Sequence, residues 1–206
     1  MKYIDFAQQF NKFPIIDVSD VKTTFSYFNS RRFYEWQKAG YIKKAAKNFY
    51  VFSDASLEEE DACFLANKLR DPSYLSLEYA LGRYSLIPEM VFLYTSVSTK
   101  KTAVFHSPVG NFDYRSLRED LFFGYTTKTG KRYSYKIAEP EKAILDFLYF
   151  RADIKTADDI EELRINADEY KGIIDERKLD KYLTAFHSPS LERKIALLRR
   201  YIQEQP

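Results

Sequence analysis

The stretch that decides the fold covers residues 29–52 and reads NSRRFYEWQKAGYIKKAAKNFYVF. Its first half predicts a short helix over residues 29–39, because Asn29 and Ser30 are favoured helix-capping types. Phe33 and Trp36 fall one turn apart and would share the buried face of that helix. A glycine follows the helix, and glycine commonly ends a helix at this position.

The second half of this stretch predicts a two-stranded hairpin. Tyr41 and Ile42 begin an extended run that ends in two lysines, and residues 45–48 then turn the chain. Residues 49–52 return as a second strand that is rich in aromatic and β-branched side chains. A short helix that leads into a basic two-stranded ribbon is the arrangement of a winged helix.

Positive charge is concentrated in this segment. From Arg31 to Lys47 there are six basic residues against the single acidic residue Glu35, whereas the whole chain has a formal net charge of +2. Such a helix and ribbon can contact a phosphate backbone and the adjacent groove of DNA. The candidate DNA-binding residues are Ser30, Arg31, Arg32, Glu35 and Lys38 on the helix and Lys43, Lys44 and Lys47 on the wing. The alternative is an ordinary solvated surface, which is the usual role of such residues.

The residues that precede this stretch complete the pattern. Residues 3–10 predict one helix, and a second helix capped by Asp17 or Ser19 runs through Val21 and Phe25. Two helices would then brace a third whose N-terminal turn enters the major groove. We therefore expect a winged helix-turn-helix domain over residues 1–54. Its small core would consist of the aromatic residues at helical spacing, which are Phe25, Phe28, Phe33 and Trp36.

Residues 55–206 predict a second, mixed α/β domain, so that the chain as a whole is α+β. An acidic run opens a helix over residues 58–69, strands are expected over residues 90–95 and 102–106, and a hairpin over residues 121–137. Residues 139–150 form a helix that is apolar nearly all round and should be buried at the centre of this domain. From about residue 156 to the end, apolar positions at helical spacing predict a helical region.

Composition limits the classes of protein to consider. The 206 residues are 45% hydrophobic, enough for a real core, and the near balance of charge means that DNA affinity must come from local clustering. We find no signal peptide and no apolar run of roughly 18 residues, so the sequence predicts a cytoplasmic protein with no membrane partner. One cysteine, Cys63, and two histidines, His106 and His187, provide no zinc-ligand spacing, and we expect no metal site and no cofactor.

Motifs of the common enzyme classes are absent. There is no phosphate-binding loop, dinucleotide fingerprint, nucleophile elbow or HExxH sequence. The runs from Glu169 to Lys171 and from Glu192 to Lys194 match the E-x-K half of a nuclease core, but neither lies on a convincing buried strand. A metal-dependent nuclease stays an alternative, and such a site would need converging acids beside a lysine. We expect no enzymatic activity.

The middle of the chain resembles a known family. Four segments show the resemblance: SYLSLEYALGRYSLIPE at residues 73–89, YTSVSTKKTAVFHSPVGNFDYRSL at 94–117, LFFGY at 121–125 and IAEPEKAILDFLYFR at 137–151. In this order they resemble the AbiEi antitoxins, a family of transcriptional regulators from phage-defence type IV toxin-antitoxin systems. The family joins an N-terminal winged helix to a mixed α/β domain.

The resemblance implies a repressor that binds inverted repeats of double-stranded DNA in its own operon promoter. It also implies an antitoxin that counteracts a nucleotidyltransferase-like toxin, without necessarily forming a stable complex with it. A different class also stays open, in which the chain is a protein-interaction module that acts on a partner mainly through its second domain.

Overall fold

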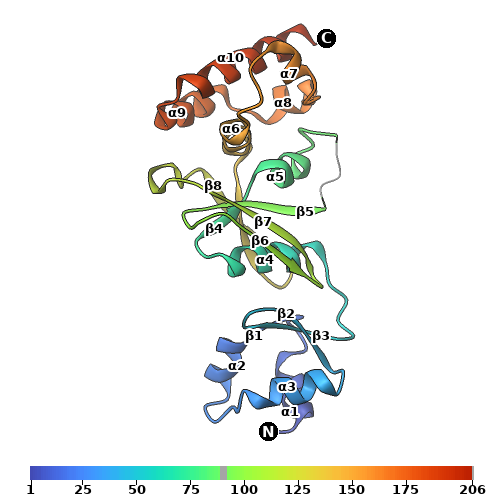
Figure 1. The fold of residues 1–206 in the computed structure, drawn as a ribbon. Helices are drawn as coiled ribbons and strands as arrows, with labels where there is room; N and C mark the ends of the chain where they lie inside the picture. The colour runs from blue at the N-terminus through green and yellow to red at the C-terminus, as the bar shows by residue number, and fades with distance from the viewer. Residues whose placement is uncertain (89–91, 206) are drawn as a thin grey trace.

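The computed structural model of the chain describes residues 1–88 and 92–205, and it confirms a mixed α+β architecture. Figure 1 shows an elongated molecule with residues 1–54, here called the N-terminal region, at one end in blue. A six-stranded sheet lies in the middle, and helices α9 and α10 lie at the opposite end in orange and red. Within the described residues, no helix combines the length and the apolar character that crossing a membrane requires.

The N-terminal region contains the three expected helices and the expected hairpin. In chain order its elements are α1 (Tyr3–Phe10), β1 (Ile15–Asp17), α2 (Val18–Thr24), α3 (Arg31–Lys38), β2 (Ile42–Ala46) and β3 (Phe49–Phe52). Asp17 caps α2, since its carboxylate accepts a hydrogen bond from the Ser19 amide at 2.8 Å. Strand β1 was not predicted; it pairs antiparallel with β3 and completes a sheet of order β1-β3-β2.

The hairpin turn is shorter than the sequence predicted. Strand β2 continues to Ala46, and the register with β3 shifts between Lys44 and Ala46. Ala45 is buried in this irregular step and so cannot belong to an exposed turn, which corrects the expected turn over residues 45–48. The chain instead reverses at Lys47 and Asn48, where Asn48 adopts a φ of 66°, a conformation that asparagine tolerates better than most residues.

The small sheet has two buried faces. Ile16, Ile42 and Phe52 belong to the core formed with α1 and α3. Ile15 and Val51, which alternate with them along the strands, belong to the larger core of residues 55–206. The core of the N-terminal region and the core of residues 55–206 therefore meet across this one sheet.

The remainder of the chain is built around the larger sheet. Its elements are α4 (Glu59–Leu69), β4 (Ser73–Leu75), α5 (Leu77–Arg83), β5 (Leu93–Ser98), β6 (Ala103–Ser107), β7 (Gly110–Ser116), the 3-10 turn η1 (Glu119–Leu121), β8 (Tyr125–Thr129) and β9 (Ser134–Ala138). The strand order is β6-β7-β5-β4-β9-β8, with β4 antiparallel to β5 and parallel to β9. In Figure 1, α4 covers the side of the sheet toward the N-terminal region, and α5 and α6 lie on the other side.

Several predicted strands shift in the structure. Met90 and Val91, the expected start of a strand, lie outside the described residues, and β5 begins at Leu93. The expected 121–137 hairpin is formed by β8 and β9, but Leu121 belongs to η1. Strands β4 and β7 were not predicted.

Helix α6 (Pro140–Phe150) is the buried centre of the C-terminal part, as the sequence predicted. The helical end consists of α7 (Ala157–Glu161), α8 (Ala167–Ile173), α9 (Glu176–Phe186) and α10 (Pro189–Glu204). Buried Lys194 of α10 donates to the backbone carbonyls of Leu148 at 2.8 Å and Arg151 at 2.6 Å. Its cation thus satisfies the last carbonyl groups of α6 and joins the two helices.

Four polar side chains are enclosed where α6 meets the sheet. Asp146 accepts hydrogen bonds from the hydroxyls of Tyr74 at 3.0 Å and Ser76 at 2.8 Å, and it pairs with Lys142. The Lys142 ammonium also donates to the Tyr74 hydroxyl at 2.8 Å. Burial raises the pKa of Asp146 and lowers the pKa of Lys142, because both charged forms lose water.

The junction between the two cores depends on Tyr133 in the turn between β8 and β9. Its ring stacks on Phe64, with 4.0 Å between centroids. Its hydroxyl accepts a hydrogen bond from the Ile15 amide and donates to the Ile15 carbonyl, both at 3.0 Å. Beside it, Arg132 pairs with the buried Asp61 at 3.1 Å.

Candidate nucleic-acid interface

Helix α3 presents a charged face to solvent. Phe33 and Trp36 are buried, and the residues on the opposite side follow the spacing i, i+3, i+4 and i+7. These outward residues are Arg31, Tyr34, Glu35 and Lys38, and we call them the outer row of α3. All eight predicted DNA-binding residues are exposed: Ser30, Arg31, Arg32, Glu35, Lys38, Lys43, Lys44 and Lys47.

Aromatic contacts fix α3 in place. Trp36 stacks on Phe6 of α1 with ring centroids 4.5 Å apart, and Phe33 stacks on Tyr50 of β3 at the same distance. At the N-terminus of α3, the Asn29 side chain accepts a hydrogen bond from the Arg31 amide at 2.9 Å. Of the two expected capping residues, only Asn29 acts in this way, since the Ser30 side chain makes no capping bond. The outer row is therefore held on a rigid support.

The two arginines of α3 differ in their freedom. Arg32 donates from Nη1 to Glu35 Oε2 at 2.8 Å, and 46% of its side chain is exposed. Arg31 lies 3.8 Å from the other Glu35 oxygen, and 80% of its side chain is exposed. Glu35 thus holds Arg32 in a hydrogen bond, whereas Arg31 extends into solvent.

The hairpin lysines divide between the two faces of the small sheet. Lys44 lies opposite Tyr50, whose ring stacks on Phe33 of α3, so Lys44 is on the side of the sheet that carries α3. Lys43 lies opposite Val51, which belongs to the core on the other side. Within the described part of the chain, Lys38, Lys43, Lys44 and Lys47 form no ion pair. The structure therefore places Lys44 on the side of the small sheet that carries α3 and Lys43 on the other side.

Two exposed tyrosines belong to this surface and were not among the predicted residues. The side chain of Tyr34 lies in the outer row, and the residue is 67% exposed. Fully exposed Tyr27 lines a groove of about 350 Å³ at the start of α3, together with Asn29 and Arg31. The spacing of Tyr34 from Arg31 and Lys38 could have identified it, because those three positions share one helix face.

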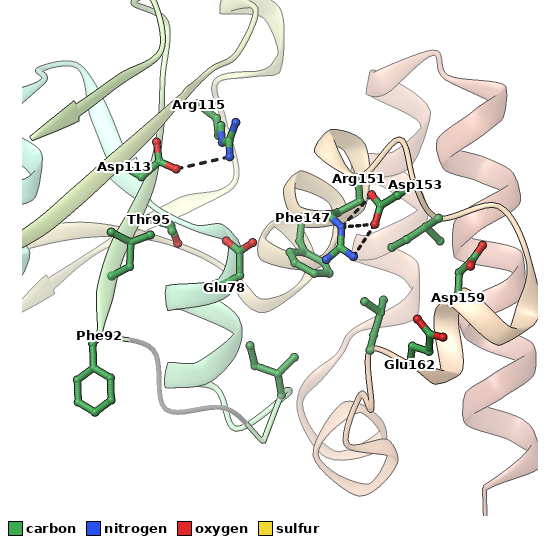
Figure 2. Close-up of a pocket in the computed structure, with 14 residues that line it drawn as sticks. Glu78, Phe92, Thr95, Asp113, Arg115, Phe147, Arg151, Asp153, Asp159 and Glu162 are labelled. Carbon is green, nitrogen blue, oxygen red and sulfur yellow. Dashed lines mark hydrogen bonds and ion pairs between the residues drawn. The ribbon is translucent and has the colours of Figure 1, made fainter.

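A second concave surface lies in the C-terminal part of the molecule (Figure 2). It is a cavity of about 870 Å³ between α5, the sheet and the segment from α6 to α7. Its two arginines already have partners: Arg151 pairs with Asp153 at 2.7 Å and Arg115 with Asp113 at 3.5 Å. Its other acidic residues are Glu78, Asp159 and Glu162.

The residues considered for nuclease chemistry do not converge. The two E-x-K matches lie on helices, Glu169 and Lys171 on α8 and Glu192 and Lys194 on α10. Among residues 1–88 and 92–205, no three histidine, cysteine, aspartate or glutamate side chains are grouped as metal ligands. Cys63 is buried beside the Tyr79 hydroxyl, and burial raises its thiol pKa to about 12.

The chain therefore has a mixed α+β fold, and its N-terminal region carries a basic helix and hairpin at one end of the molecule. No protein-family model matches the sequence, and no curated protein matches it.

Proposed function

We propose that the chain is a DNA-binding transcriptional regulator and antitoxin of the AbiEi type that acts in the cytoplasm. In this proposal residues 1–54 are a winged helix-turn-helix domain and residues 55–206 are the antitoxin-type domain. The order of three helices followed by a hairpin supports the first assignment. The four segments between residues 73 and 151 that resemble AbiEi antitoxins support the assignment of the second domain.

One observation carries the DNA-binding part of the proposal. The outer row of α3 and the neighbouring hairpin carry lysines that pair with no acidic residue of the described ranges, on a support fixed by aromatic contacts. Such lysines can replace the counterions of a phosphate backbone without first breaking internal salt bridges. In the proposed complex α3 enters the major groove of double-stranded DNA and the β2–β3 wing lies along the flanking phosphates.

The test is a binding titration of the full chain with a duplex from its own operon promoter and with a scrambled duplex, at several salt concentrations. We expect tighter binding to the promoter, and affinities for both duplexes that fall linearly with the logarithm of salt concentration. A control protein with Lys38, Lys44 and Lys47 all changed to Ala should bind both duplexes weakly. Absence of binding by the unchanged protein to either duplex would refute the DNA-binding function.

The antitoxin part needs a separate test, because it rests on the resemblance. The most informative observation is whether the gene immediately downstream encodes a nucleotidyltransferase-like protein. If it does, co-expression of this chain should restore growth of cells that express that gene. Failure of rescue by a protein that still represses the promoter would leave a regulator without antitoxin activity.

A second candidate function is that of an interaction module that acts through its C-terminal part. The cavity in Figure 2 favours it, because its volume is within the range of ligand and side-chain binding sites. Co-purification with the product of the neighbouring gene is the measurement. A complex that is lost on Glu78→Arg, but kept on Lys44→Ala, would support this function.

A further inference from the structure

The two adjacent arginines at the start of α3 occupy different positions on the proposed DNA surface. The side chain of Arg31 projects directly away from the buried pair Phe33 and Trp36, whereas Arg32 lies at the flank of the helix. The exposed fractions of their side chains, 80% and 46%, follow this difference. Arg31 therefore lies in the middle of the outer row.

Their electrostatic partners differ as well. A guanidinium reads guanine by donating two parallel hydrogen bonds to O6 and N7 in the major groove. Arg32 already donates to Glu35 at 2.8 Å, so it would have to break this bond and leave the carboxylate near the DNA without its partner. At 3.8 Å, Arg31 makes an ion pair with Glu35 but no hydrogen bond, and its donors stay available.

We propose that Arg31 is the specificity-determining arginine of the interface and recognises a guanine, while Arg32 is a positioning residue that holds Glu35. Tyr34 lies one turn after Arg31 in the outer row and provides an exposed ring beside the bases that Arg31 contacts. In this pair Arg32 neutralises Glu35, the acidic side chain of the outer row, and keeps it from repelling phosphates. This inference rests on the proposed DNA-binding function and names the base that it recognises.

The test is selection of bound sequences from a pool of random duplexes with the full-length protein, followed by titrations. The unchanged protein should enrich a motif that contains an invariant guanine. Arg31→Ala should lose the preference at that base, with affinity for the selected duplex lowered about 5- to 150-fold and affinity for a scrambled duplex changed far less.

Arg32→Ala is the matched control, since it removes an arginine from the neighbouring position. It should keep the guanine preference, and its affinity should fall by a similar factor on both duplexes because Glu35 then repels phosphates. Glu35→Gln should raise affinity for both duplexes and leave the selected motif unchanged.

Two outcomes would overturn the inference. One is loss of the guanine preference in Arg32→Ala with the preference kept in Arg31→Ala. The other is equal losses on selected and scrambled duplexes for Arg31→Ala, which would make it a phosphate contact. If the unchanged protein enriched no motif and bound neither duplex, the DNA-binding function itself would fail, and this result is distinct from the other two.

Discussion

Helices α3 and α6 carry an acid and a base at the same spacing, in opposite environments. Arg31 and Glu35 on α3 are four residues apart and exposed, and Lys142 and Asp146 on α6 are four residues apart and fully buried. An exposed pair contributes about 0–1 kcal/mol, whereas removal of one partner from a buried pair costs about 3–5 kcal/mol. The same local spacing thus gives a solvent-exposed charged face in one helix and an enclosed ion pair in the other.

The neighbours of each helix explain the difference. Helix α3 is covered on one side only, so its charges remain in water and are available to a ligand. Helix α6 is surrounded by the sheet and by α5, α9 and α10, and its charges are buried with it. Burial is possible because Tyr74 and Ser76 complete the hydrogen bonds of Asp146.

Of the substitutions that test this difference between α3 and α6, Asp146→Ala should lower stability the most. The substitution leaves the Lys142 ammonium buried without its counterion, and we expect the free energy of unfolding to fall by about 3–5 kcal/mol. Urea unfolding followed by circular dichroism is the measurement. Glu35→Ala on α3 is the control and should change stability by less than about 1 kcal/mol. Equal losses for the two variants would show that burial does not distinguish the pairs.

Leu148→Ala tests the apolar side of α6 and should have the next largest effect. Leu148 is buried among the surrounding elements, so its truncation should leave a cavity and lower the free energy of unfolding by about 2–5 kcal/mol. Differential scanning calorimetry would record the lowered melting temperature. The control is Leu93→Ala, at a partly exposed position, which should cost much less. A stable Leu148→Ala protein would mean that α6 repacks easily and is not the rigid centre.

Tyr133→Phe tests the contact at the boundary between the two cores. It removes two hydrogen bonds to Ile15 while it keeps the ring stacked on Phe64, and we expect a loss of about 1–3 kcal/mol. Amide hydrogen exchange should be faster at Ile15 than in the unchanged protein. Tyr27→Phe, at a fully exposed position, should alter neither quantity. Unchanged exchange at Ile15 would contradict the role of the hydroxyl.

Lys44→Ala should have the smallest effect on stability, within about 0.5 kcal/mol, because the side chain is exposed. Its effect should be seen on DNA, where the slope of affinity against salt should fall by about one unit. Lys43→Ala is the matched control, since Lys43 lies on the other face of the sheet and should change the slope less. Equal slopes for the two variants would mean that the DNA contacts both faces of the hairpin.

Much of the N-terminal region could be predicted from the sequence, because its signals are local. Capping residues, a terminal glycine and apolar residues at helical spacing predict α1, α2 and α3 within one or two residues. Strand β1 has only three residues, and β4 is a three-residue buried strand, and both are too short for alternation to show. Ala45 was misassigned to the turn because no local pattern distinguishes an irregular step in a strand from a reversal.

The candidate site was predicted only in part, because only some of its features depend on local sequence. Charge and spacing identified the eight exposed residues, but not which arginine Glu35 would hold or which lysine would share a face with α3. Those features depend on side-chain geometry and strand register. The burial of Lys142 and Asp146 depends on Tyr74 and Ser76, about 70 residues away in the chain, and no local pattern reports such a contact.

The hydroxyl of Tyr133 has a consequence for association of the chain with itself. Strand β1 is the outermost strand of its sheet, and the Ile15 amide and carbonyl that face away from β3 would otherwise be open to a strand of another molecule. Tyr133 occupies both groups, as a fourth strand would. Outer strands with unpaired backbone groups promote edge-to-edge aggregation. A single phenol therefore closes this edge of the small sheet, and its loss should increase aggregation on storage even where the protein stays folded.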